Sequence, residues 1–303
     1  MLNVYLPGTG GMKPLPERFL TGLWIEKDGK ALLVDCGEGM QVALAKQKRS
    51  LAKLDALLIT HFHADHIAGL PGLLLSAGNF SKTTPLKIYA PKGAKEIIRG
   101  LCSICPELPF ELEITELTEQ KEIFEVINIK VEAMYVQHRM DCYCYSFTEN
   151  RKSSFNPFKA RNLGIPVEQW KLLHEGGSVI LDGITITSDM VTSEPRKPIK
   201  VTYITDTVYF DELADFAIDS DLLISEGMYG NDELIPKMQE KGHMVFSQAA
   251  QLAVKSNSKE LWLTHYSPAL DKPYEYIEFV NGIFPNTIVS ADGQHKEIRG
   301  TKI

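Results

Sequence analysis

Three histidines and one aspartate lie within six consecutive residues of this chain. They are His61, His63, Asp65 and His66, in the run THFHADHIAG. His61 and His63 are two residues apart, so both imidazole rings point the same way if the segment is extended. Asp65 and His66 follow where the chain turns toward a helix, so they can face a second position. Imidazole and carboxylate ligands favour zinc and also suit manganese or iron. Without a cation between them, such clustered groups would repel one another and lose hydration, so the cluster predicts a metal centre.

Three more candidate ligands stand at the ends of β-like runs. His138 ends YVQH, Asp206 ends KVTYITD and His265 ends ELWLTH. Each alone could be a simple polar cap, but together with the cluster they supply enough ligands for two ions. We expect one ion to be held by three histidines, the other by one aspartate and two histidines, and a second aspartate to lie between them. In that order the residues are His61, His63 and His138, then Asp65, His66 and His265, then Asp206. Two such ions can share a hydroxide nucleophile and neutralise the charge of an in-line displacement at phosphorus.

The elements that must position these residues alternate between strand and helix. Short apolar runs that predict buried strands lie at 31–35, 54–60, 86–91, 200–206, 221–227 and 260–265. Helices are expected at 38–48, 69–79 and 245–257, whereas 110–149 is rich in β-type residues. No repeat or linker divides the chain. We therefore predict one α/β domain over 1–303, built as two packed mixed sheets with outer helices.

Residues 150–176 interrupt this pattern. The segment carries five basic residues, Arg151, Lys152, Lys159, Arg161 and Lys171, in a chain whose net charge is −7. A solvated helical insertion would have the same composition, because charge runs often mark exposed faces. An arm that contacts RNA phosphates is the other interpretation, and both stay open.

The overall composition narrows the class of protein. Apolar residues make up 44% and charged residues 23% of the chain, as in ordinary globular proteins. No apolar run reaches the roughly 18–20 residues that span a bilayer, and MLNVYLPGTG lacks the pattern of a signal peptide, so we expect a cytoplasmic protein without a membrane partner. The net charge argues against a surface coated with basic residues for nucleic acid.

The motifs resemble those of the metallo-β-lactamase superfamily, and within it those of ribonuclease Z, the transfer-RNA 3′-processing endonuclease. The similar segments are LLVDCGEGMQ with Asp35, ITHFHADHIAGLPGLL, YITDT, GHMVFSQAAQLA and LTHYSP. The resemblance implies a metallo-β-lactamase-like αββα sandwich, two zinc ions, a homodimer and a transfer-RNA precursor as substrate. It also implies catalytic roles: Asp65 orients the attacking water or takes its proton, and His243, supported by Glu226, steadies the developing charge or protonates the leaving oxygen.

The chain departs from the family pattern at several positions. Val208 stands where the family has an arginine, Ser225 where it has a histidine, and VEQW follows LGIP where Gly-Pro is usual. In the RNA interpretation, Arg151, Lys152, Lys159 and Arg161 grip the substrate. One alternative is a phosphodiesterase or other small-molecule hydrolase on the same fold. Another, of a different class, is a nucleic-acid-binding protein with a vestigial metal site.

Overall fold

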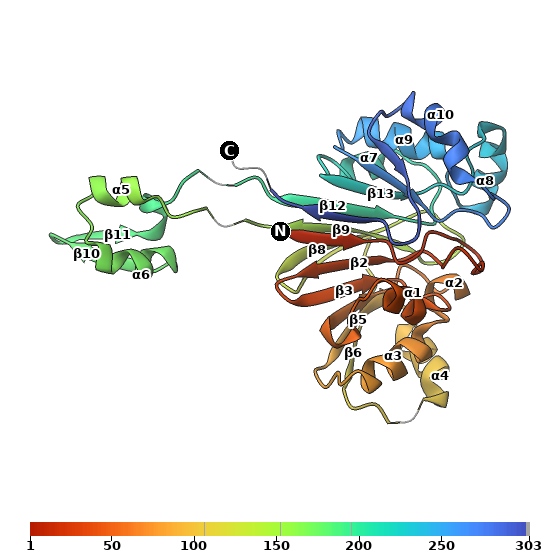
Figure 1. Cartoon of the computed structure of the whole chain (residues 1–303), viewed down its shortest axis with the longest axis horizontal. Helices are drawn as coiled ribbons and strands as arrows, with labels where there is room; N and C mark the ends of the chain where they lie inside the picture. Colours follow the sequence, from red (N-terminus) through yellow and green to blue (C-terminus); the bar gives the residue numbers. More distant parts are fainter. Residues whose placement is uncertain (106, 152, 195, 301–303) are drawn as a thin grey trace. The chain divides into compact units, whose positions relative to one another are not determined.

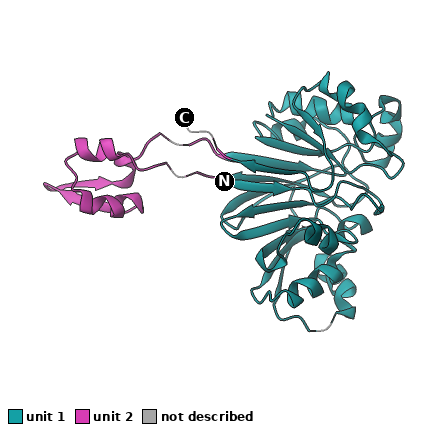
Figure 2. Cartoon of the chain, viewed as in Figure 1, with its two compact units in different colours: residues 1–149, 199–298 teal, residues 150–198, 299–303 magenta. Residues whose placement is uncertain are grey.

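The computed structural model describes residues 1–105, 107–151, 153–194 and 196–300 (Figure 1). No helix in these ranges is both long enough and apolar enough to cross a membrane. The chain divides into two compact units, residues 1–149 with 199–298, and residues 150–198 with the chain end from residue 299 (Figure 2). The prediction that the whole chain forms one domain stays a prediction.

Seven strands of the first unit form one mixed sheet, in the order β16-β1-β2-β3-β4-β5-β6. Their bounds are β1 Leu2–Tyr5, β2 Leu23–Lys27, β3 Lys30–Val34, β4 Leu54–Leu58, β5 Leu86–Pro91, β6 Leu112–Leu117 and β16 His295–Ile298. The strands from β3 to β6 run parallel, and the pairs from β16 to β3 are antiparallel. The predicted strands at 31–35, 54–60 and 86–91 are confirmed in this sheet.

The second sheet is also mixed and has the order β15-β14-β13-β12-β9-β8-β7. Its strands are β7 Lys121–Val126, β8 Ile129–Tyr135, β9 Tyr143–Glu149, β12 Ile199–Ile204, β13 Leu222–Glu226, β14 Leu261–Thr264 and β15 Thr287–Val289. Strands β12 to β15 run parallel, so their carboxyl ends meet at one edge of the sheet. The β-rich segment 110–149 is shared between the sheets, because β6 joins the first and only β7, β8 and β9 form the meander.

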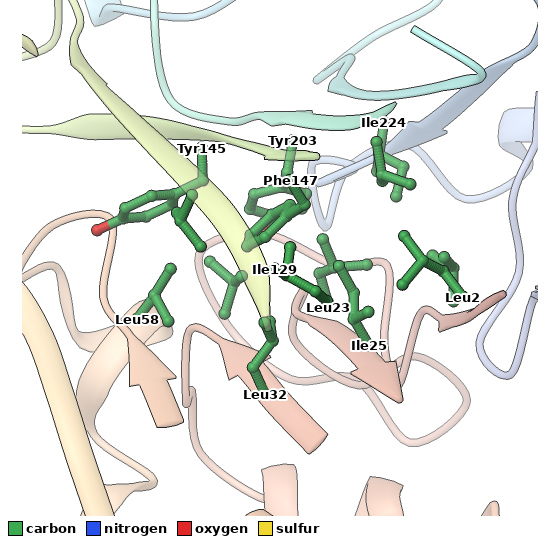
Figure 3. Packing of buried hydrophobic residues seen from close by; sticks show 14 of the residues in the cluster. Leu2, Leu23, Ile25, Leu32, Leu58, Ile129, Tyr145, Phe147, Tyr203 and Ile224 are labelled. Atoms are coloured by element: carbon green, nitrogen blue, oxygen red, sulfur yellow. The ribbon is translucent and has the colours of Figure 1, made fainter. Parts of the chain in front are cut away.

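The core lies between the inner faces of the two sheets (Figure 3). Leu23 and Leu32 of the first sheet pack there with Phe147 and Tyr203 of the second, all of them buried. Strands that alternate inward and outward side chains can bury two faces, so the outer faces need helices. Helices whose apolar residues join the clusters on the outer faces are α1 Met40–Lys46, α2 Ala64–Ile67, α3 Leu70–Asn79, α4 Ala94–Leu101, α7 Glu212–Phe216, α9 Phe246–Lys255 and α10 Ile277–Asn281. The predicted αββα sandwich is confirmed.

Shorter elements complete the chain. Helix α8 spans Ile235–Lys241, and its Met238 packs with Met228 and Val245. Single turns of 3-10 helix are Leu51–Lys53, Cys102–Ile104, Val167–Gln169, Ser188–Val191, Asp232–Leu234 and Pro273–Tyr276.

The second unit has a small core of its own. It contains α5 Pro157–Asn162, α6 Trp170–His174, and the antiparallel pair β10 Ser178–Leu181 and β11 Ile184–Thr187. The side chain of Asn156 begins α5 by accepting hydrogen bonds from two backbone N–H groups, as helix N-caps do. The unit extends to residue 198, so it includes a hairpin beyond the segment 150–176 that the sequence singled out.

Candidate metal centre

Three of the candidate site residues follow the ends of strands in an unusual backbone conformation. Asp35 follows β3, Asp206 follows β12 and His265 follows β14, with φ angles of 61°, 53° and 61°. A residue with a side chain reaches this left-handed region only at a cost, on the order of 1–3 kcal/mol at functional sites. The surrounding sheet supplies the stability that holds all three there.

The loop that carries the HxHxDH residues is held by close contacts between backbones. Cys36 N donates to His66 O at 2.7 Å, and Gly69 N donates to Cys36 O at 2.9 Å. A Cβ atom on Gly37 would lie 2.1 Å from the carbonyl oxygen of Asp65, and one on Gly69 would lie 2.0 Å from that of Gly37. Only glycine fits at both positions. The close packing of Cys36 and Gly37 against residues 65–69 therefore fixes where Asp65 and His66 point.

The structure brings four donors together as the first candidate group: His61, His63, His138 and Asp206. Nε2 of His61 lies 2.9 Å from Nδ1 of His63, which lies 3.3 Å from Nε2 of His138. Oδ1 of Asp206 lies 3.9 Å from Nε2 of His61. Burial lowers the pKa of His61 well below its usual value and also lowers the pKa values of His63 and His138. All three rings are therefore neutral near pH 7, which is the form that binds a metal ion.

A second group consists of Asp65, His66 and His265, with Asp206 beside it. Oδ2 of Asp206 lies 3.2 Å from Nε2 of His66 and 3.3 Å from Nε2 of His265. Oδ2 of Asp65 lies 3.5 Å and 3.6 Å from the same two nitrogens, which are 3.3 Å apart. Ligands of a tetrahedral zinc ion, each about 2.0–2.1 Å from the metal, are about 3.3 Å from one another. The spacing of these donors therefore fits a zinc-sized cation, with one oxygen of Asp206 turned to each group.

Buried hydrogen bonds hold the far side of two of these rings. Nδ1 of His66 donates to Oδ2 of Asp35 at 2.8 Å, and Nδ1 of His138 donates to the carbonyl oxygen of Gly242 at 2.9 Å. Asp35 is fully buried and also accepts from the backbone N–H and the hydroxyl of Thr60. In the neutral form of each ring, such partners leave the lone pair on Nε2, toward the other donors.

His243 and Glu226 form a pair beside the same cluster. Nδ1 of His243 donates to Oε2 of Glu226 at 2.9 Å, and lies 3.6 Å from Oδ1 of Asp206. Glu226 is fully buried at the end of β13, where its other oxygen accepts from Thr207 N at 2.7 Å. Burial lowers the pKa of His243, but the charge of Glu226 and its hydrogen bond outweigh burial and raise the pKa to about 9. His243 is thus positioned to give a proton.

A pocket of about 320 Å³ opens over both groups. Its lining includes two cationic side chains, Arg139 and Lys241, which the sequence analysis missed. Arg139 follows His138 directly, and Lys241 precedes the Gly242 whose carbonyl holds that histidine. The position of Arg139 directly after His138 could have identified it from sequence, whereas Lys241 comes near the candidate site only through the fold.

The basic residues of segment 150–176 belong to the second unit. Nζ of Lys159 donates to the carbonyl oxygen of Thr192 at 2.7 Å, and the guanidinium of Arg161 lies 5.7 Å from the centre of the Trp170 ring. Arg151 is partly buried, and Lys152 lies outside the described residues. Part of this positive charge therefore supports the fold of the unit itself.

Comparison with known proteins identifies the family. The chain is 45% identical over 299 residues to a ribonuclease Z of Lachnospira eligens, covering 99% of this chain and 98% of that one. It is 40% identical to a ribonuclease Z of Clostridium acetobutylicum, covering 98% of each. The chain belongs to the ribonuclease Z family. This membership confirms the expectation of a metal-dependent hydrolase.

A family model and two solved structures also match the chain. Residues 2–157, just over half of the chain, match a family model described as "Anti-Pycsar protein Apyc1", so the chain is also a member of the group which that model represents. The crystal structure of human tRNase Z, short form, has a TM-score of 0.71 at 22% identity and covers 98% of this chain and 99% of its own. The metallo-β-lactamase fold protein YhfI from Bacillus subtilis has a TM-score of 0.69 at 20% identity, covering 97% and 98%. These two likenesses show the fold.

Proposed function

We propose that the protein is a two-zinc endoribonuclease that processes the 3′ ends of transfer-RNA precursors. The carrying observation is the arrangement of two donor groups around Asp206, with the His243–Glu226 pair beside them. Relatives at 40–45% identity are named ribonuclease Z, and a structural neighbour is a tRNase Z. We further propose that it works in the cytoplasm as a homodimer, which the family resemblance supports.

In this proposal the two donor groups would each hold one ion. His61, His63 and His138 would hold one ion and Asp65, His66 and His265 a second, while Asp206 has one carboxylate oxygen near each donor group. The donor set of neutral imidazoles and carboxylates suits zinc. When bound, two such ions lower the pKa of water and neutralise charge at the phosphate.

The residues of the chain supply orientation and a proton. Asp65, whose Oδ2 accepts from Met12 N at 2.6 Å, is held where it can orient the attacking water. His243 gives its proton to the leaving oxygen, and Glu226 keeps it charged until then. Arg139 and Lys241 line the pocket and supply the positive charge that a phosphate requires in an acidic chain.

The test compares two substrates with one preparation of known metal content. Wild-type protein with about two zinc equivalents should cleave precursor transfer RNA and also hydrolyse bis-p-nitrophenyl phosphate. Asp206→Asn should abolish both activities and lower the metal content. Brisk hydrolysis of the small ester without cleavage of the precursor would favour the phosphodiesterase alternative. Metal binding without either activity would favour the vestigial site.

The second unit supplies a separate part of the proposal, as the arm that grips RNA. Replacing Arg151, Lys152, Lys159 and Arg161 together should weaken transfer-RNA binding and flatten its dependence on salt, because each lost phosphate contact lowers the slope by about 0.7–0.9. Hydrolysis of the small ester should be unchanged. An equal loss on both substrates would show that these residues support the fold instead.

A further inference from the structure

A second pocket, of about 390 Å³, lies in the first unit. Its lining includes Lys121, Tyr135, Gln137, Phe210 and Glu212, none of which belongs to the candidate metal centre. The chemistry proposed above uses none of these side chains.

The two pockets share a wall made of two chain segments, 135–138 and 206–210. The segments are hydrogen-bonded to each other, since Val208 N donates to Gln137 O at 3.1 Å and Gln137 N donates to Thr207 Oγ1 at 3.2 Å. His138 and Asp206 line the metal pocket, whereas Gln137 and Phe210 line the second pocket. Neighbouring residues thus serve different pockets, so the two pockets lie on either side of this wall, and residues that line one are within a few positions in the chain of residues that line the other.

Two aromatic rings give the second pocket surfaces that can stack on a flat molecule. The hydroxyl of Tyr135 donates to Oδ1 of Asp141 at 2.9 Å, and its ring meets Tyr143 edge-to-face at 5.6 Å, so the ring is fixed in advance. Phe210 is partly buried and lines the pocket. Its neighbour Tyr209 lies instead beneath the ammonium of Lys255, 5.1 Å from the ring centre.

The polar groups of this pocket select for a base rather than a bare phosphate. One cation, Lys121, is offset by one carboxylate, Glu212, so the lining has no excess positive charge. The amide of Gln137 and the carboxylate can pair with donors and acceptors on the edge of a base. Aromatic stacking with polar groups at the edge is how proteins hold unpaired bases of RNA.

The segment 206–210 also departs from the family pattern, at Val208. Val208 stands where the resemblance implies an arginine, and Tyr209 and Phe210 follow it. A long cationic side chain at 208 would add charge to the wall that both pockets share. Valine at 208 adds no such charge, and of the two aromatic residues that follow it Phe210 lines the second pocket.

We propose that this second pocket, called the base pocket here, binds the unpaired nucleobase next to the scissile phosphate. The proposal rests on RNA being the substrate. It makes Phe210 a residue that positions and selects substrate, with no part in the chemical step.

The experiment uses Phe210→Ala on precursor transfer RNA. Stacking is worth about 1–3 kcal/mol per base, so kcat/KM should fall about 5- to 160-fold, mainly through KM. Two precursors are compared, each with an abasic nucleotide on one side of the scissile bond. The precursor that lacks the base bound in the pocket should be cleaved by the wild type with a similarly lowered kcat/KM. On that precursor Phe210→Ala should cause no further loss. Hydrolysis of methyl p-nitrophenyl phosphate, whose methyl group cannot fill the base pocket, should be unchanged. Phe279→Ala, at a partly exposed phenylalanine of α10, is the matched control.

Unchanged cleavage by Phe210→Ala, or an equal further loss on both abasic precursors, would overturn the proposal. Failure of the wild-type protein to cleave any precursor would overturn the proposed function instead. In that case adenosine, which has no phosphate to bind the metal centre, tests the base pocket directly by saturation-transfer NMR. Binding that is lost in Phe210→Ala supports the base pocket, and no binding to the wild type refutes it.

Discussion

Asp35→Asn should weaken one metal site while leaving the fold intact. In the wild type, Oδ1 of Asp35 accepts from Thr60 N at 2.8 Å and Oδ2 accepts from Nδ1 of His66 at 2.8 Å. Asparagine has the same shape but only one acceptor oxygen. It can therefore satisfy one of these two donors and not both.

Either orientation of the new amide has a cost. If its oxygen keeps Thr60 N–H, the NH₂ group faces Nδ1 of His66 and moves the ring proton to Nε2, the nitrogen that faces Asp206 at 3.2 Å. If the amide flips, two N–H donors face each other, and a buried donor without a partner costs about 1–3 kcal/mol. Loss of such an outer partner typically weakens metal binding about 10- to 100-fold, and we expect that loss at the ion held by Asp65, His66 and His265.

Zinc titration against a chromophoric chelator measures both binding constants, and thermal melting of the metal-free protein checks the fold. The matched control is Asp292→Asn. Asp292 is a partly buried carboxylate that accepts from Thr9 Oγ1 at 2.8 Å and Phe19 N at 2.6 Å but contacts no candidate ligand. If Asp35→Asn binds both zinc ions with wild-type affinity, or if Asp292→Asn loses as much zinc affinity as Asp35→Asn, the reasoning is refuted.

Three further predictions concern the pocket. His243→Ala should lower turnover about 10²- to 10⁴-fold, the usual contribution of a general acid, with the metal content unchanged by elemental analysis; lost metal would make it a ligand instead. Glu226→Gln removes the charge that raises the pKa of His243 to about 9, so this pKa falls toward 6.5 and the alkaline limb of kcat should shift to lower pH; an unmoved limb would contradict the pairing. Gly11→Ala would place Cβ 2.8 Å from Cε1 of His265 and displace the ring, so activity should fall on the order of 10²-fold, whereas Gly100→Ala, with open space around it, should be neutral in the same assay.

Sequence reasoning succeeded for the candidate ligands at strand ends, because a local pattern there also determines which residues meet in the fold. Buried apolar runs that end in His138, Asp206 and His265 predict strand ends, and the carboxyl ends of parallel strands meet at one edge. The structure places all three of these residues with the HxHxDH cluster. Whether they bind metal stays a prediction, since the structure shows only their geometry.

The hairpin of the second unit had a local signal that was not used. Asp182 and Gly183 lie between two β-type runs, and both have positive φ angles, 49° and 81°, as a type I′ turn requires. The placement of β6 had no such signal. Residues 112–117 have β character, but only pairing with β5, which local sequence does not encode, assigns them to the first sheet.

The left-handed residues show why the centre depends on the whole sandwich. Glycine adopts a positive φ without strain, yet Asp35, Asp206 and His265 have side chains that the candidate centre would use. Each follows a strand most of whose residues are buried, so the sheets fix the point at which the chain must turn. The strain is local, whereas the packing that opposes it is spread over the core between the sheets. A cavity in that core, for example at Phe147, should therefore loosen the donors before it unfolds the protein. Weaker zinc binding at temperatures below the thermal transition would be the measurable sign.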